Sequence, residues 1–249
     1  MRLYYATDLH GSEKCWKKFI AAAKYYQADV LVMGGDITGK FIVPFISMPK
    51  GRVEATFMGQ KRVMKKEADV ERLKQQVINT GQYPVDMTPE EFETYNNNPG
   101  LLDELFKKLL YERVEQWMKY ADEKLRGQNV RVFVTAGNDD LFEIDEAIAK
   151  SEIIVNHDGK IIDLGEGFEM FGMGYANITP WHCPRDIPEE ELAAKIESVA
   201  KNIKNPERAI FDIHVPPYDT EIDSAPELTE KLQMVMSATG TPKMKPVGS

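Results

Sequence analysis

The chain has 249 residues, 43% of them hydrophobic, so it is long enough to bury one large core or two small ones. Its formal net charge of −9 argues against non-specific nucleic-acid binding, although a bound metal can still attract a phosphorylated substrate. No apolar run reaches the roughly 18 residues of a membrane span, the N-terminal segment turns polar at Asp8, and two cysteines are too few for a disulfide framework. We therefore expect a cytoplasmic protein with reduced thiols and no membrane partner.

The first part of the chain alternates between strand and helix. Its hydrophobic periodicity predicts a strand at about 2–7, an amphipathic helix at about 13–26 and a second strand at 29–33. Such alternation is typical of parallel strands joined by crossover helices, so the expected fold class is α/β.

The alternation breaks between Asp36 and Asn138, which lie about 100 residues apart, far more than a crossover needs. We predict one domain, 1–249, with a largely helical insertion at 40–128. The insertion either caps a substrate site or supports a sheet edge or an oligomer contact, and the sequence favours neither. Its expected elements are a hairpin (41–43 with 52–58), a charged helix (65–79) and a long helix (101–126).

Strand and helix alternate again after Asp140. His157 lies in an Asn-His-Asp-Gly turn, and we expect it at the surface. Pro188 and the three glutamates that follow it suit the N-terminus of a helix expected at 188–204. The expected elements are a short helix (142–150), three strands (153–155, 160–164 and 168–173), a helix (188–204), a strand (208–213) and a final helix (225–237).

Four of the expected strands end in polar residues of the kind that bind metals. Each residue alone has an ordinary structural explanation, such as a helix cap or a strand-end turn, but the repeated placement favours a shared site. Carboxylate, amide and imidazole groups are ligands of divalent Mn, Fe or Zn. Asp36 follows a glycine pair and is the candidate ligand bridging two ions. The strand-end residues are Asp8, His10, Asp36, Asn138, Asp139 and His214.

The order Asp-x-His, Gly-Asp, Gly-Asn and His resembles the calcineurin-like metallophosphoesterases. The resemblance is strongest to a bacterial and archaeal branch with a long insertion and a Gly-Asn-Asp-Asp third motif. It implies a four-layer α/β/β/α sandwich and two divalent ions. Asp8, His10 and Asp36 would hold the first ion, and Asp36, Asn138 and His214 the second. The implied reaction is hydrolysis of a phosphomonoester or phosphodiester, in which a metal-bound hydroxide attacks phosphorus.

The sequence departs from this family at two points. Asp139 stands where most members have a histidine that helps the leaving group depart, and an ionised carboxylate cannot donate a proton. Asp139 would act as an acid only when protonated or through a held water, or it would interact with a metal. No histidine follows His214, although the family closes its site with a Gly-His-x-His motif. We expect the chain to be truncated before that motif, with real divergence as the alternative.

Two function classes remain open after these departures. The first is a phosphoesterase acting on a phosphorylated small molecule or another phosphoester. The second is a non-catalytic binding or scaffold protein on the same fold with a degenerate site. The segment 181–184 contains His182 and Cys183 and is best explained as a packed loop, with His182 as a candidate substrate-binding residue. The sequence has neither a P-loop nor a nucleophile elbow, which disfavours P-loop nucleotide hydrolases and serine hydrolases.

Overall fold

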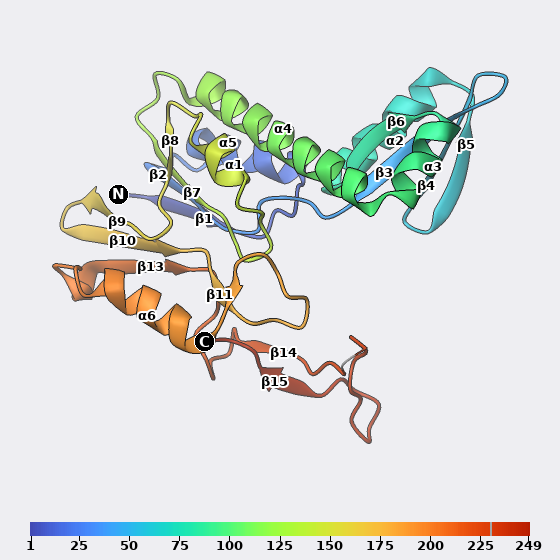
Figure 1. Cartoon of the computed structure of the whole chain (residues 1–249). Coiled ribbons are helices and arrows are strands. Elements are labelled where there is room, and N and C mark those ends of the chain that lie inside the picture. Colours follow the sequence, from blue (N-terminus) through green and yellow to red (C-terminus); the bar gives the residue numbers. More distant parts are fainter. Residues whose placement is uncertain (230) are drawn as a thin grey trace. The chain divides into compact units, whose positions relative to one another are not determined.

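The computed structural model describes residues 1–229 and 231–249, which form two compact units (Figure 1). Both units combine helices with parallel strand pairs, so the mixed α/β class expected from the sequence is confirmed. Six α-helices lie within the described residues. The first unit comprises Met1–Phe133 and Leu141–Asn156, and the second comprises Val134–Asp140 and His157–Ser249.

The first unit contains a four-stranded sheet with the order β1-β2-β7-β8. β1 and β2 are parallel, with Leu3 opposite Val30. Every residue of β2 is buried, as expected for a strand covered on both faces. The last two residues of β7 belong to the second unit. The strands are β1 (Leu3–Ala6), β2 (Val30–Gly34), β7 (Arg131–Thr135) and β8 (Ile154–Asn156), with the short helix α5 (Ile144–Ile148) preceding β8.

Two helices pack together in the first unit through a pair of tryptophans. α1 (Glu13–Tyr25) begins after Ser12, whose hydroxyl accepts a hydrogen bond from a first-turn amide. The ring of Trp16 stacks on that of Trp117 in α4 (Pro99–Leu125), with centroids 5.1 Å apart and planes 5° apart. The indole N–H of Trp16 also donates to the Trp117 carbonyl at 3.2 Å. These contacts fix the C-terminal half of α4 against α1.

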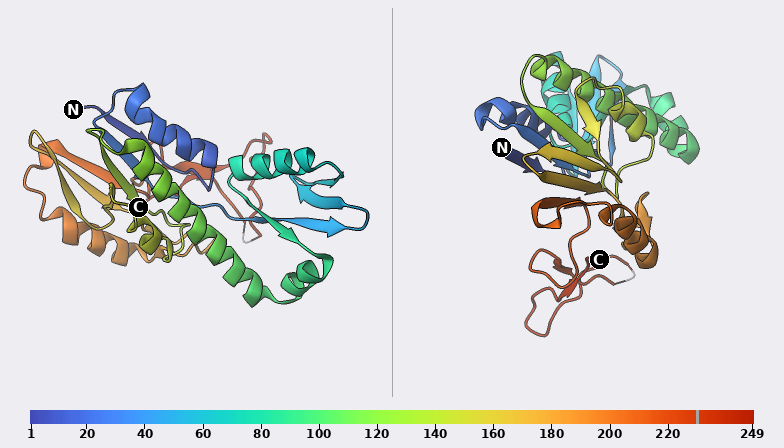
Figure 2. Two further views of the ribbon diagram at one scale, coloured as in Figure 1. Left: turned by 90° about the horizontal axis from the view of Figure 1, so that it is seen from above. Right: turned by 90° about the vertical axis from the view of Figure 1, so that its left-hand side faces the viewer.

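A second sheet, ordered β5-β4-β3-β6, lies at one end of α4 together with α2 and α3 (Figure 2). The predicted hairpin is present, because β3 pairs antiparallel with β4. β3 also pairs parallel with β6, and α2 connects β5 to β6. Phe45 and Val77 are fully buried between sheet and helix. The elements are β3 (Ile42–Met48), β4 (Arg52–Phe57), β5 (Gln60–Met64), α2 (Glu67–Asn79), β6 (Tyr83–Met87) and α3 (Pro89–Asn97).

The second unit is built on a three-stranded sheet with the order β13-β10-β9. β10 is parallel to β13 and antiparallel to β9. Leu192 of α6 packs against Phe171 and Met173 of β10 in a buried cluster. The elements are β9 (Ile161–Gly165), β10 (Phe168–Met173), β11 (Ala176–Asn177), β12 (Asp186–Ile187), α6 (Glu189–Ala200), η1 (Pro206–Arg208), β13 (Ala209–Ile213), β14 (Ser224–Pro226) and β15 (Met244–Pro246).

The predicted final helix at 225–237 was wrong. β14 pairs antiparallel with β15, and a bridge joins Leu228 to Met234. A helix there would need a packed apolar face, but Leu232, Met234 and Met236 are all exposed. Hydrogen bonds between neighbouring segments of the chain satisfy backbone groups instead; for example, the Val235 amide donates to the Glu227 carbonyl at 2.8 Å.

The prediction of a surface position for His157 was also wrong. Its side chain is fully buried, and its Nε2 lies 2.6 Å from a carboxylate oxygen of buried Asp212 on β13. Gly172 makes room for the ring, because a Cβ atom there would come within 2.3 Å of it.

Among the described helices, none is long and apolar enough to cross a membrane.

Candidate metal centre

Three of the predicted ligands, Asp8, His10 and Asp36, converge in the first unit. Each offers one ligand atom, and these atoms all lie within 4.8 Å of one another. Nε2 of His10 is 3.6 Å from a carboxylate oxygen of Asp8 and 3.8 Å from one of Asp36. Atoms that share one ion at bonds of about 2.1 Å lie roughly 3–4 Å apart. This group, called the triad below, therefore has a donor set and spacing that fit a divalent ion.

The triad residues all have left-handed backbone conformations. The φ angles are 57° at Asp8, 43° at His10 and 48° at Asp36. Such angles are uncommon for residues other than glycine and cost of order 1–3 kcal/mol each. Hydrogen bonds between the two strand-end loops hold them: the Asp8 amide donates to the Gly35 carbonyl at 3.0 Å, and the His10 amide to that of Asp36 at 2.9 Å. The loops after β1 and β2 therefore form one backbone unit around the triad.

The charges around the triad favour a cation. Asp36 is 6% exposed, whereas the side chains of Asp8 and His10 are about half exposed. The pKa of His10 is raised, chiefly by its interaction with Asp8 and also by the charge of Asp36, while burial and Lys40 act in the opposite direction. Two carboxylates beside one imidazole produce a negative potential that attracts a divalent ion.

Three glycines form the backbone packing behind the triad. A Cβ atom at Gly81 would lie 1.7 Å from the His10 carbonyl, and one at Gly39 would lie 1.7 Å from the Gly81 carbonyl. Gly11 has a φ of 77° and would also clash with Gly81 if it carried a side chain. The connection between α2 and β6 thus packs main chain to main chain against the loop that carries His10.

Two further predicted ligands, Asn138 and His214, meet in the second unit. The amide oxygen of Asn138 lies 3.1 Å from Nε2 of His214, although the two residues are 76 positions apart in the chain. Asn138 follows β7, and His214 follows β13 with its amide donating to the Met173 carbonyl at 2.8 Å. Two ligand atoms at right angles on one ion lie about 3 Å apart, so this pair also has a spacing compatible with a shared metal.

Asp186 holds the amide of Asn138 in place and was missed by the sequence reasoning. One of its carboxylate oxygens accepts a hydrogen bond from the Asn138 side-chain nitrogen at 2.8 Å. The other accepts from the amide and hydroxyl of Thr179 at 2.9 and 2.6 Å and from the Cys183 amide at 2.9 Å. The Asn138 nitrogen is thereby directed at Asp186 and its oxygen at His214. No motif marks Asp186 in the sequence, because its partner lies 48 residues away.

Asp139, the candidate leaving-group residue, is half-buried beside Cys183. The thiol of Cys183 donates to the Asp139 carboxylate at 3.7 Å. His182, the candidate substrate-binding residue, is exposed on the same loop as Cys183 and has a φ of 49°. The prediction of a packed loop at 181–184 was wrong for most of the segment, because Trp181, His182 and Pro184 are exposed, while the half-buried Cys183 contacts Asp139.

Asp140 folds the loop that carries Asn138. Its side chain is fully buried and accepts a hydrogen bond from the Gly137 amide at 2.8 Å. Its carbonyl accepts from Nε of buried Arg185 at 3.0 Å. The polar run after β7 thus divides its roles: Asn138 faces His214, Asp139 meets a thiol, and Asp140 shapes the turn.

Comparison with known proteins finds little that bears on activity. No family model matches the chain. The uncharacterized protein MJ1162 of Methanocaldococcus jannaschii is 33% identical over 95 residues, which cover 38% of this chain and only 40% of that protein. One crystal structure is similar with a TM-score of 0.48 and 14% identity, over 95% of this chain and 76% of the other. Function must therefore be argued from the site residues themselves.

Proposed function

We propose that this protein is a metal-dependent phosphoesterase of the calcineurin-like class, hydrolysing a phosphomonoester or phosphodiester with two divalent ions. The main support is the convergence of Asp8, His10 and Asp36 in strained backbone at the ends of two parallel strands. Strained polar residues concentrate at functional sites. The four-layer α/β/β/α arrangement and the role of residues 40–128 as an insertion beside the site belong to the same proposal.

The residues fit the proposed metals by their chemistry. Asp8, His10 and Asp36 would hold one ion, and Asn138 with His214 would hold another, with Mn, Fe and Zn as the compatible metals. Bound divalent ions supply a deprotonated water at neutral pH and positive charge that stabilises the transition state of phosphoester hydrolysis.

The chain's own polar residues would orient these ligands and the substrate. Asp186 restrains the amide of Asn138, as outer carboxylates commonly do for metal ligands. Asp139 is assigned to the leaving-group side by its place in the motif, where it donates a proton only when protonated or through a held water. His182 is assigned to substrate binding. With a net charge of −9, we expect neither non-specific nucleic-acid binding nor a membrane surface as partner.

A non-catalytic binding protein on the same fold is the second candidate. One observation favours it: the second-unit pair offers an amide oxygen and an imidazole but no negative charge. Within the described residues, only the triad forms a cluster of three charged or imidazole ligands. A site that binds one ion firmly and a second ion weakly would suit binding better than hydrolysis.

Metal stoichiometry and turnover after Mn²⁺ loading and buffer exchange test the proposal. We expect about two ions per chain and hydrolysis of bis(p-nitrophenyl) phosphate or p-nitrophenyl phosphate. Asp36→Asn should remove the triad ion and lower kcat at least 100-fold, because it deletes one ligand charge. Asp69→Asn is the matched control, since Asp69 lies on α2, outside the triad, with a half-exposed side chain, and the variant should keep both properties.

The outcomes separate the two candidates. Near-normal turnover by a folded Asp36→Asn protein would sink the phosphoesterase assignment. One bound ion with no hydrolysis of either ester would support the binding protein instead.

A further inference from the structure

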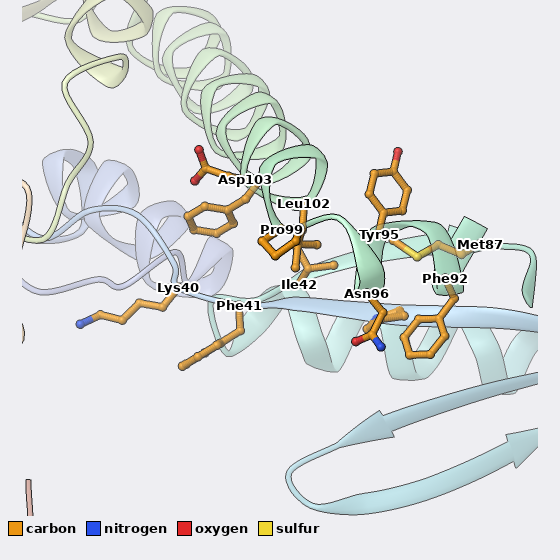
Figure 3. A pocket seen from close by; sticks show the side chains of 12 residues that line it. Lys40, Phe41, Ile42, Met87, Phe92, Tyr95, Asn96, Pro99, Leu102 and Asp103 are labelled. Atoms are coloured by element: carbon orange, nitrogen blue, oxygen red, sulfur yellow. The ribbon is translucent and has the colours of Figure 1, made fainter. Parts of the chain in front are cut away.

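A largely apolar pocket of about 440 Å³ lies within the first unit, beside the β3–β6 sheet (Figure 3). β3, β6, α3 and the start of α4 supply its walls. This volume falls in the range of small-molecule sites, which are mostly apolar with a few polar groups. Its aromatic walls are Phe41, Phe92, Tyr95 and Phe106, and its polar groups include Asn96 and Asp103.

Lys40 connects the pocket to the triad. It lines the pocket and is only four residues beyond Asp36, so the two Cα atoms are at most about 14 Å apart. Lys40 therefore lies along the chain between the triad residue Asp36 and the wall of the pocket. Figure 3 shows its side chain extending away from the other labelled pocket residues, next to Phe41.

The pocket wall and the loop of the triad are held together by direct contacts. The hydroxyl of buried Tyr83 accepts a hydrogen bond from the Gly39 amide at 3.1 Å. Phe106 packs edge-to-face on the Tyr83 ring with centroids 5.7 Å apart. The Arg113 guanidinium lies 5.1 Å from the same ring centre and donates to the Gly11 carbonyl at 3.5 Å. The pocket thus has a fixed position relative to the triad.

We infer that this pocket binds a planar aromatic group of the substrate, which makes the substrate a phosphoester of an aromatic alcohol or of a nucleoside. Aromatic side chains bind a flat ring by stacking and edge-to-face contact. The Lys40 cation, which lines the pocket four residues beyond Asp36, complements the phosphate charge. Asn96 and Asp103 offer hydrogen bonds to a polar ring edge such as that of a nucleobase. The substrate assignment rests on the proposed function, whereas ring binding by the pocket does not.

Ligand binding tests the pocket without depending on turnover. Calorimetry would compare phenylphosphonate with methylphosphonate, which carry the same anionic group and are not esters. We expect the phenyl compound to bind about 10-fold more tightly, as one stacked ring commonly provides. Phe41→Ala should reduce the preference to below about 2-fold. Phe41 is 65% exposed, so its truncation should leave the fold intact.

Phe142→Ala is the matched control, because Phe142 is 51% exposed in the same unit but does not line the pocket. It should keep the full preference. Lys40→Met should weaken both phosphonates by a similar factor and leave their ratio unchanged. Equal binding of the two phosphonates by the unaltered protein, or an unchanged preference in Phe41→Ala, would overturn the inference.

Two further comparisons identify the ring and separate this inference from the proposed function. The first comparison is the ratio of the affinities for 5′-AMP and ribose 5-phosphate, and the second is the ratio for phenylphosphonate and methylphosphonate. A larger first ratio identifies a nucleobase as the bound ring. A larger second ratio identifies a simple aryl group. Ring binding that depends on Phe41, without hydrolysis of any ester, would reject the phosphoesterase and the substrate assignment while keeping the pocket as a ring-binding site. Hydrolysis without a ring preference would reject the pocket and keep the phosphoesterase.

Discussion

At the scale of single residues, the candidate metal ligands are held in positions that the chain does not adopt readily. Asp8, His10 and Asp36 all have positive φ angles, and interloop hydrogen bonds maintain them. Such strain persists only where the surroundings determine it, and it keeps the side chains directed at one point before any ion binds. This explains how a cluster with two carboxylates can exist in a half-exposed loop.

Asp186 provides the sharpest residue-scale prediction. Asp186→Ala removes the acceptor for the Asn138 amide and for three other donors, so the amide oxygen should lose its fixed orientation. We expect the affinity for the second Mn²⁺ to fall about 10–100-fold, as for other outer ligands, with the triad ion unaffected. Titration of Mn²⁺ by electron paramagnetic resonance measures both affinities. Glu190→Ala, an exposed carboxylate on α6, should change neither. Unchanged affinity for both ions in Asp186→Ala would show that Asp186 has only a structural role.

At the scale of elements, the junction between α2 and β6 determines where His10 lies. Gly81 approaches the His10 carbonyl so closely that any side chain would displace one of the two segments. The same junction leads into β6, whose first residue, Tyr83, bonds to Gly39. Elements far apart in the sequence therefore position the strand-end loops by direct main-chain contact.

Alanine substitutions at two glycines distinguish the energetic cost of losing this close contact from the cost of a positive φ angle alone. Gly51→Ala, at φ 66° with open space around it, should cost about 1 kcal/mol of unfolding free energy. Gly81→Ala, at φ 86°, adds a clash at 1.7 Å and should cost over about 3 kcal/mol. Urea denaturation measures both costs. Gly81→Ala should also weaken Mn²⁺ binding to the triad, because His10 must move. Similar costs for the two variants would contradict the importance of the contact.

At the scale of the whole molecule, the chain passes three times between its two units, after Phe133, Asp140 and Asn156. Each unit is made of two separate segments, and three covalent crossings join them to the other unit. Unfolding of one unit therefore frees chain ends that the other unit holds in place. We therefore expect one cooperative thermal transition rather than two.

Metal binding should shift that transition. An ion that binds only the folded chain stabilises it by about 2.7 kcal/mol at a concentration 100-fold above its Kd. Scanning calorimetry with and without Mn²⁺ should show a single transition that moves to higher temperature and returns when a chelator is added. Asp36→Asn should lose most of the shift. Two separate transitions, only one of which responds to Mn²⁺, would show that the units unfold independently.

Local pattern was enough to predict much of the fold and one cluster of candidate metal ligands. Apolar runs such as the one in β2 predict strands, because burial requires apolar side chains whatever their tertiary partners are. Polar residues directly after β1 and β2 predict a shared site, because parallel neighbours end at one edge. The expectation that Asp8, His10 and Asp36 lie together is confirmed by the structure, while their role as metal ligands stays a prediction.

Only the tertiary structure decided the features that depend on contacts between distant residues. Asp186, buried His157 and the pocket beside Lys40 all arise from side chains tens of positions apart that fold to within a few ångströms. Ala225 and Pro226 lie in a strand pair, and Leu232, Met234 and Met236 are exposed rather than buried on a helical face, which local composition does not reveal. Sequence periodicity indicates whether a side chain needs to be buried. The residue that it packs against depends on the tertiary arrangement of distant segments.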